Sequence, residues 1–210
     1  LALTIERVAD GLDNPWAVAF LPDGRYLVSE RSGGLNLVDA EGRIEALSGL
    51  PRVSQNGQGG LLDVALHPEF GDGEHDWIYF TWSKPEGSQS RSALSRVKWQ
   101  DDALGEVEHL FEQDRASSPG RHYGSRLAWL KDGTLLMSIG DRGVDPSRAQ
   151  ARDDHAGSTL RLTETGDVPD DNPFVDDDDT LDEIYTLGNR NIQGMTVLSN
   201  GEPWATEHGP

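Results

Sequence analysis

Polar side chains able to move a proton and stabilise negative charge occur at matching positions of a weak internal repeat. Gln58, His122 and Arg190 each stand six or seven residues before a small residue within a short apolar segment. Neutral imidazole can accept a proton near physiological pH, and the planar arginine cation suits carboxylates and developing oxyanions. The amides of Gln58 and Asn191 can orient a polar ligand. This set suits removal of a hydroxyl proton while negative charge builds on a carbonyl oxygen, which is the form of hydride transfer from an alcohol to a quinone.

Each of these residues also has a structural interpretation. A single histidine before a strand is more often a hydrogen-bonding partner than a base, Arg190 and Asn191 could tie down a loop, and Gln58 could cap a turn. The functional interpretation rests on the equivalent position of these residues in the repeat. In the first repeat unit, Asp13 occupies that position. Glycines accompany three of the positions: Gly57, Gly59, Gly60, Gly120, Gly124, Gly188 and Gly194. Because glycine has no side chain, we expect the backbone to approach a ligand closely there.

Four hairpin-like units carry these positions. Each consists of an apolar strand, a turn rich in Pro, Asp, Asn or Gly, and a second strand. The first strands lie at 16–21, 62–66, 126–130 and 194–198, and the second strands at 26–30, 77–81, 135–139 and 203–207. Three of the four turns contain Asp-Gly or Asn-Gly, a strong short-range hairpin signal. Further short strands are predicted at Leu3–Val8, Gly34–Val38 and Ala93–Trp99, and helical periodicity is nearly absent.

The repeat predicts an all-β fold of the β-propeller type. The small residues that anchor it, Ala19, Ala65, Ala128 and Thr196, lie about 45 to 70 residues apart, as expected for blades with insertions. In a propeller the first strand of each blade lines the central axis, so the residues before these strands should meet around one cavity. Three complete blades and the start of a fourth leave apolar faces and strand edges unpaired. We therefore interpret residues 1–210 as a single propeller domain truncated at its C-terminus, with a four-bladed ring and an ordinary β-sandwich as alternatives.

Composition narrows the classes of function. Lys and Arg total 18 against 37 Asp and Glu, a net charge of −19 that disfavours nucleic acid as a partner. The absence of cysteine excludes disulfides, thiol nucleophiles and Cys-ligated metal centres. No apolar run reaches the roughly 20 residues of a membrane span. No signal peptide is visible, so we expect any targeting segment to have been removed or left out.

Other catalytic and metal-binding motifs are missing. The sequence has no P-loop, dinucleotide-binding glycine motif or serine-hydrolase elbow. The other histidines, at positions 67, 75, 109, 155 and 208, show neither HExxH nor paired-ligand spacing, so the sequence gives a zinc site little support. The segment Asp170–Asp179 is predicted to be a loop between strands. Its carboxylates could bind calcium, but it lacks the spacing and the glycine of an EF-hand, and a run of like charges is typical of a solvated loop.

Several motifs, taken in order, resemble one protein family. They are Gly57–Leu66, His122–Leu127, Gly166–Phe174 and Glu207–Pro210, and together with Asn14-Pro15-Trp16 they span essentially the whole chain. They resemble the glucose/sorbosone dehydrogenase family, in particular its bacterial soluble aldose sugar dehydrogenases. The resemblance implies a six-bladed β-propeller, of which this chain covers about the first three to four blades. It also implies a periplasmic or secreted enzyme that oxidises the C1 hydroxyl of aldoses to lactones with pyrroloquinoline quinone and Ca²⁺.

The resemblance further implies roles for individual residues. His122 resembles the family's general base, which takes the proton from the anomeric hydroxyl while hydride passes to the quinone. Gln58, Arg190 and Asn191 resemble cofactor contacts, with Arg190 placed to stabilise charge on the quinone oxygen. The backbone carbonyls of Gly209 and Pro210 resemble ligands of the calcium ion. The implied partners are an aldose substrate and an external electron acceptor, and a homodimer is compatible with the family.

Two features depart from the family pattern. Its Arg-Asn-Pro-Gln-Gly segment has Ile192 in place of proline, which should loosen a turn while keeping the polar pair. Family members also continue into further blades with basic residues for the cofactor carboxylates and a second calcium site, so we expect this fragment alone to be inactive. Two other functions stay open, a non-catalytic extracellular binding propeller and a calcium-dependent propeller lactonase. A lactonase should have Glu or Asp before the inner strands, where only Asp13 qualifies.

Overall fold

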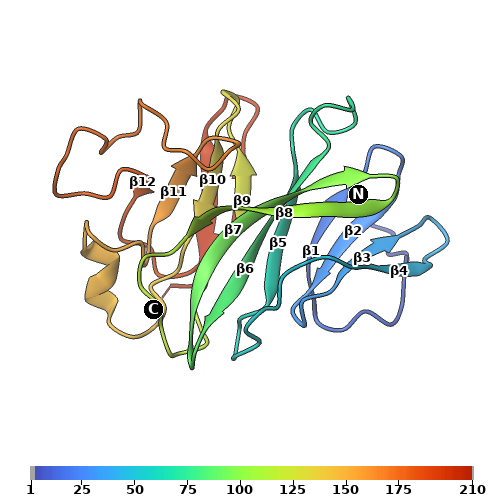
Figure 1. Cartoon of the computed structure of the whole chain (residues 1–210), viewed down its shortest axis with the longest axis horizontal. Helices are drawn as coiled ribbons and strands as arrows, with labels where there is room; N and C mark the ends of the chain where they lie inside the picture. Colours follow the sequence, from blue (N-terminus) through green and yellow to red (C-terminus); the bar gives the residue numbers. More distant parts are fainter. Residues whose placement is uncertain (1–2, 210) are drawn as a thin grey trace.

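The computed structural model describes residues 3–209, which form four antiparallel β-sheets (Figure 1). The first sheet contains β1 (Pro15–Phe20), β2 (Tyr26–Glu30), β3 (Leu35–Val38) and β4 (Ile44–Leu47). The second contains β5 (Leu61–Leu66), β6 (Trp77–Glu86), β7 (Gln89–Gln100) and β8 (Ala103–Glu112). The third contains β9 (Leu127–Trp129), β10 (Leu135–Ser138), β11 (Thr159–Leu162) and β12 (Ile184–Thr186), and the fourth contains β13 (Ile192–Val197) and β14 (Pro203–Glu207). A short 3₁₀ helix, η1 (Pro146–Gln150), follows β10, and no helix among these residues is long and apolar enough to cross a membrane.

The four repeat units are the first hairpins of the four sheets. They are β1–β2, β5–β6, β9–β10 and β13–β14, each antiparallel, which confirms the hairpin prediction. Tight turns close the hairpins: the Leu21 carbonyl accepts from Gly24 N (3.0 Å) and the Leu198 carbonyl from Gly201 N (2.8 Å). Both glycines have φ near +90°, a conformation that glycine adopts without side-chain strain. The strands predicted at 34–38 and 93–99 are β3 and the second half of β7.

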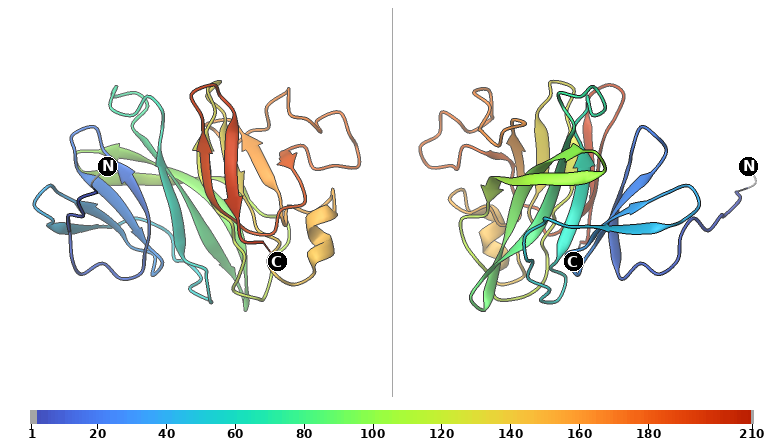
Figure 2. Two further views of the ribbon diagram at one scale, coloured as in Figure 1. Left: turned by 180° about the vertical axis from the view of Figure 1, so that it is seen from behind. Right: turned by 45° about the vertical axis from the view of Figure 1, so that its right-hand side comes forward.

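The sheets stand side by side with their first strands adjacent (Figures 1 and 2). β5 contacts both β1 and β9, and β9 contacts β13. Side chains link neighbouring sheets in place of a backbone ladder: Ser29 Oγ of β2 donates to the Leu62 carbonyl of β5 (2.6 Å), and Asp63 Oδ2 of β5 accepts from Leu127 N of β9 (2.8 Å). This arrangement is the blade packing of a β-propeller. The total of six blades and the truncation stay predictions.

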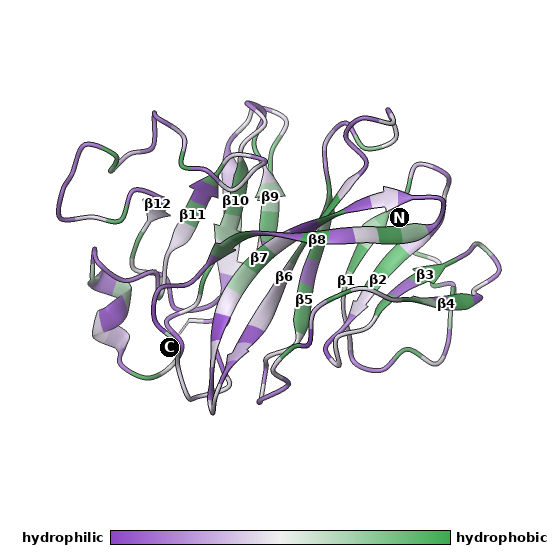
Figure 3. Ribbon diagram, viewed as in Figure 1, coloured by the Kyte–Doolittle hydropathy of each residue, from purple (hydrophilic) through white to green (hydrophobic). Residues whose placement is uncertain are grey.

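Two apolar layers lie between successive sheets, and β6 contributes to both. Ile78 and Phe80 pack into the layer shared with the first sheet, whereas Tyr79, between them in sequence, packs into the layer shared with the third. Successive side chains of a strand point to opposite faces, so a strand buried on both sides is apolar at nearly every position. Figure 3 shows hydrophobic residues concentrated along the strands and hydrophilic residues along the loops. The sheets are therefore held rigidly to one another, and so are the loops at their ends.

The predicted strand at Leu3–Val8 is wrong. Residues 3–14 contain no strand, and Leu3 and Ile5 are 92% and 97% exposed. Figure 2 shows the start of this segment running away from the sheets. Alternating apolar residues form a strand only beside a partner that exchanges backbone hydrogen bonds, and no strand in the described part of the chain pairs with this segment.

The acidic segment Asp170–Asp179 lies in the connection between β11 and β12, as predicted. The connection is nevertheless anchored. Buried Asn172 donates from Nδ2 to the carbonyls of Arg161 (3.1 Å) and Asp182 (2.9 Å), and Arg161 Nη1 donates to Asp171 Oδ1 (2.6 Å). Two of the polar side chains in this run thus hold the loop in place.

Candidate active site

The inner strands begin at one rim of the molecule, and a cavity of about 260 Å³ opens there. It is lined by Trp16, Arg31, Gln58, Leu62, Tyr123, Gly124, Asn191, Gln193 and His208. These residues come from all four sheets and lie at the starts of the first strands or at the ends of the second strands. Polar groups separated by up to about 190 positions in the sequence therefore converge on one small space.

Hydrogen bonds join the predicted site residues of the second, third and fourth sheets. Gln58 Oε1 accepts from the backbone N–H of His122 (2.8 Å), and Asn191 Oδ1 accepts from that of Gly124 (3.0 Å). Each amide oxygen thus accepts a hydrogen bond from the loop that carries His122. Neither Gln58 Nε2 nor Asn191 Nδ2 donates a hydrogen bond to another residue within 3–209. The two NH₂ groups are therefore available to a ligand with carbonyl or carboxylate oxygens.

His122 is oriented by a residue that the sequence did not single out. Asp141 Oδ1 lies 2.6 Å from His122 Nδ1, and the carboxylate is 6% exposed at the residue level. Asp141 also accepts from Gly143 N (2.8 Å), and its own N–H donates to the Arg190 carbonyl (2.8 Å). A carboxylate accepting from Nδ1–H leaves the Nε2 lone pair of the imidazole to accept a proton. Asp141 thus connects the histidine loop of the third sheet with the Arg190 loop before the fourth.

The backbone around His122 is strained and tightly packed. His122, Ser125 and Arg142 all have positive φ (52°, 74° and 61°), which residues with side chains rarely adopt. Arg142 is fully buried, and its guanidinium lies 3.5 Å from the centroid of the Tyr123 ring. Burial lowers the pKa of Arg142, although contact with Tyr123 opposes that shift. Such conformations persist where the surrounding structure over-determines them, and they cluster at functional sites.

Gln58 and Asn191 line the cavity, and His122 lies on the loop beside it. The other predicted residues within 3–209 do not line the cavity. Arg190 lies at the same rim, but its Nη1 donates to the His208 carbonyl (3.0 Å) and its side chain does not line the cavity. Asp13 is exposed, its N–H donates to Glu30 Oε1 (2.6 Å), and it does not line the cavity either. Gly209 is exposed and follows His208 on this rim, whereas Pro210 lies outside the described residues.

Two expectations about the loops need correction. Two of the glycines before the inner strands admit neighbouring protein backbone rather than a ligand: a Cβ at Gly57 would lie 2.1 Å from the Gly120 carbonyl oxygen, and one at Gly60 would lie 2.1 Å from that of Arg31. Gly124, by contrast, lines the cavity. Ile192, in place of the family's proline, does not lie in a turn. It begins β13, pairs with Glu207 and is 4% exposed, so the substitution falls within a paired strand.

Sequence reasoning missed Trp16, Arg31, Asp141 and His208. The prediction made from the repeat considered only residues before first strands, but in an antiparallel hairpin the second strand ends at the rim where the first begins. Arg31 follows β2, Asp141 lies three residues after the end of β10, and His208 follows β14. The hairpin pattern in the sequence could therefore have predicted that residues after the second strands also lie at this rim. Arg31 adds a guanidinium that donates from Nη2 to the Gly57 carbonyl.

The fold and this rim define a β-propeller protein with a polar cavity lined by amides, the Arg31 guanidinium and the His208 imidazole, beside the loop that carries the His122–Asp141 pair. The family profile described as "Glucose / Sorbosone dehydrogenase" matches residues 12–210. The chain belongs to this family. That result confirms the resemblance inferred from the motifs.

Characterised relatives agree with this assignment. The chain is 37% identical to aldose sugar dehydrogenase YliI of Escherichia coli, over 99% of this chain and 57% of that protein. It is 28% identical to quinoprotein glucose dehydrogenase B of Acinetobacter calcoaceticus, over 97% of this chain and 48% of that protein. A solved structure of the PQQ-bound form of aldose sugar dehydrogenase from Streptomyces coelicolor superposes with a TM-score of 0.84 at 30% identity, covering 98% of this chain and 60% of that one. The chain thus spans about half the length of the curated relatives it matches.

Proposed function

We propose that the protein to which this chain belongs oxidises the C1 hydroxyl of aldoses to lactones, using pyrroloquinoline quinone and Ca²⁺. The observation that carries the proposal is the contact between His122 Nδ1 and buried Asp141, beside two amides whose NH₂ groups donate no hydrogen bond within residues 3–209. This arrangement combines an oriented proton acceptor with donors for a carbonyl-rich ligand. Family membership and the names of the relatives support the same reaction. A periplasmic or secreted location and an external electron acceptor belong to this proposal.

The residues present fit the proposed cofactor. Pyrroloquinoline quinone is a planar anion, and the protein carries a net charge of −19, so local cations and donors must offset repulsion. Arg31, Gln58 and Asn191 supply such groups at the cavity. A planar surface is provided by Trp16, whose ring faces the Arg126 guanidinium at 4.1 Å on one side. The backbone carbonyl of Gly209, with that of Pro210, is proposed to bind the calcium ion.

When bound, the quinone supplies an electrophilic carbon that accepts hydride, and calcium polarises the quinone. The chain's own residues handle the proton. His122 Nε2 accepts the C1 hydroxyl proton of the sugar, while Asp141 fixes the tautomer and stabilises the imidazolium formed. Gln58 holds the His122 loop through its backbone N–H, so cofactor contact and base position are coupled through one side chain. Arg190, held by the His208 carbonyl, places positive charge at the rim where negative charge develops.

The decisive experiment is reconstitution of the intact protein with pyrroloquinoline quinone and Ca²⁺, followed by dye reduction with glucose and other aldoses. We expect turnover in the parent and at least about 100-fold lower kcat in His122→Ala. His109→Ala is the matched control, because His109 lies on β8 and bonds to Ser95 Oγ (3.0 Å), away from the rim. Absence of dye reduction by folded, cofactor-saturated parent would contradict the proposal and favour a non-catalytic binding propeller. Equal losses in both histidine variants would remove His122 as the base.

A further inference from the structure

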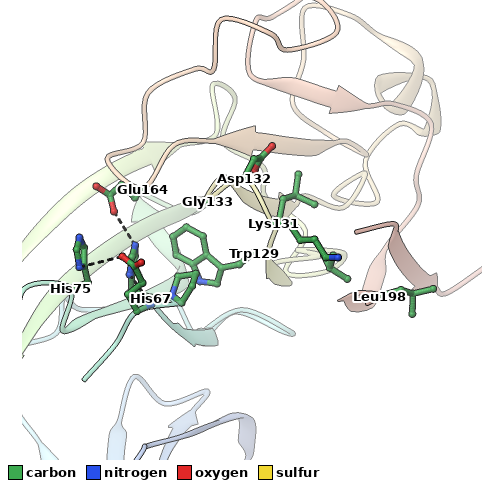
Figure 4. A pocket seen from close by; sticks show the side chains of 12 residues that line it. His67, His75, Trp129, Lys131, Asp132, Gly133, Glu164 and Leu198 are labelled. Atoms are coloured by element: carbon green, nitrogen blue, oxygen red, sulfur yellow. Dashed lines mark hydrogen bonds and ion pairs between the residues drawn. The ribbon is translucent and has the colours of Figure 1, made fainter. Parts of the chain in front are cut away.

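A second and larger cavity, of about 690 Å³, opens at the opposite ends of the same inner strands (Figure 4). Its walls include His67 and Glu69 after β5, Trp129 to Gly133 around the end of β9, and Leu198 after β13. β5 is six residues long, so the two rims lie about 20 Å apart at about 3.3 Å per residue. Nothing in the proposed dehydrogenase chemistry uses this rim.

Two imidazoles and a carboxylate meet in the wall of this cavity. His67, Glu69 and His75 each offer one donor atom, and these atoms all lie within 4.8 Å of one another. The two imidazole rings are stacked, with centroids 4.8 Å apart and planes inclined by 16° (Figure 4). Glu69 Oε2 lies 3.4 Å from His75 Nδ1. The three donors come from one loop between β5 and β6, whose residues 67–76 bring both histidines to the same place.

A neighbouring carboxylate contacts one nitrogen of each ring. Glu164 Oε2 lies 2.9 Å from His67 Nε2, and Asp72 Oδ2 lies 2.6 Å from His75 Nδ1. A carboxylate that accepts from one ring N–H leaves the lone pair of the other nitrogen to a metal, the arrangement found around metal-binding histidines. At His67 that second nitrogen, Nδ1, now accepts only a long bond from Glu69 N (3.2 Å), which a metal can replace.

The buried half of the site is rigid. His67 is 8% exposed and packs edge-on against Trp129, with ring centroids 5.2 Å apart. Trp129 is itself held by a hydrogen bond from Nε1 to the Leu66 carbonyl (2.8 Å). Glu69 and the partly exposed His75 complete the site from the solvent side. Only the outer groups therefore need to adjust for the donors to reach metal-binding distance.

We propose that His67, Glu69 and His75 form a binding site for Zn²⁺, remote from the rim that carries His122. Two imidazoles and one carboxylate suit a borderline cation such as Zn²⁺, whereas Ca²⁺ prefers an all-oxygen set. Three protein ligands leave a coordination position for water, directed to the cavity. The spacing of one and five residues between successive ligands matches no helical metal motif, which explains why the sequence pattern gave no zinc prediction.

The test measures zinc binding by the intact protein, produced without a histidine tag and stripped with a chelator. Equilibrium dialysis against micromolar Zn²⁺ should leave one zinc per chain that millimolar Ca²⁺ does not displace. Glu69→Gln and His75→Gln should each weaken zinc affinity by about 10- to 100-fold. Both residues lie toward the solvent side, so the variants should keep the parent circular dichroism spectrum. His109→Gln, on β8, is the matched control and should bind zinc like the parent.

X-ray absorption at the zinc edge provides the second readout. It should show two imidazole ligands and oxygen ligands at about 2.0–2.1 Å. The proposal is overturned if no stoichiometric zinc is retained, if zinc binding survives in the Glu69→Gln/His75→Gln double variant, or if Ca²⁺ competes equally. None of these outcomes depends on sugar oxidation, so failure here is distinguishable from failure of the proposed function.

Discussion

Gly140 offers a sharp test of how rigidly the candidate active site must be held. It lies between β10 and Asp141, and a Cβ added there would stand 2.1 Å from the His122 carbonyl oxygen and 3.1 Å from Asn191 Oδ1. Gly140 is not among the glycines with positive φ, so alanine at this position meets only a steric obstacle. Gly140→Ala therefore displaces the loop of the proposed base without removing any functional group.

The size of the effect follows from the distances. A carbon–oxygen contact normally begins at about 3.3 Å, so the His122 backbone must move by about 1 Å. A displacement of that size costs about 100-fold in rate, or about 2.7 kcal/mol of transition-state stabilisation. Overpacking also costs about 1–3 kcal/mol of folding stability. We expect kcat to fall more than cofactor affinity, because the closer clash is with His122 and the milder one with Asn191.

The assay compares the intact, reconstituted parent with Gly140→Ala and with a control, Gly105→Ala. Gly105 also lacks a positive φ, lies on β8 and would bring its Cβ no closer than 3.4 Å to the Lys98 carbonyl oxygen. Steady-state dye reduction gives kcat, fluorescence titration gives cofactor affinity, and circular dichroism gives the folded fraction. Were folded Gly140→Ala to turn over within twofold of the parent, the inference that the His122 loop positions the reacting groups would be refuted.

Two further predictions concern stability. Burial lowers the pKa of His155, but bonds from its ring to Asp114 (2.9 Å) and Glu183 (2.7 Å) outweigh that effect and raise it to about 8. The folded-state pKa exceeds the unfolded value of about 6.5, so protonated His155 adds about 2 kcal/mol to the free energy of unfolding. This stabilisation is fully present below pH 6.5 and is lost as pH rises through about 8. Urea unfolding from pH 6 to 9 should show that loss in the parent and not in His155→Gln; parallel curves would contradict the assignment. Asp63→Asn should lower the free energy of unfolding in urea by about 1–3 kcal/mol at unchanged m-value. Leu127 N donates to Oδ2 and Arg126 to Oδ1, and asparagine keeps only one of these oxygens. An unchanged midpoint would show that the inner-strand link is dispensable.

The hairpins and their order could be read from the sequence because both depend on short-range features. Asp-Gly and Asn-Gly turns between apolar runs specify antiparallel pairs whose strands are only a few residues apart. A repeat of such units implies stacked blades, and blade geometry then places Gln58, His122 and Asn191 at one rim. Gly57 and Gly60 were located correctly but explained wrongly, since the packing of one loop against another is invisible until both loops are placed.

The sequence alone therefore determined the all-β architecture, the family and the part of the molecule where polar groups converge. Tertiary structure decided which partners those groups meet. Asp141 reaches His122 and Glu164 reaches His67 across loops whose separation no local rule encodes. The failed strand at Leu3–Val8 shows the same limit, because an alternating pattern becomes a strand only where the fold supplies a neighbour. Local propensity acts over a few residues, whereas side-chain contacts depend on how whole sheets are packed together.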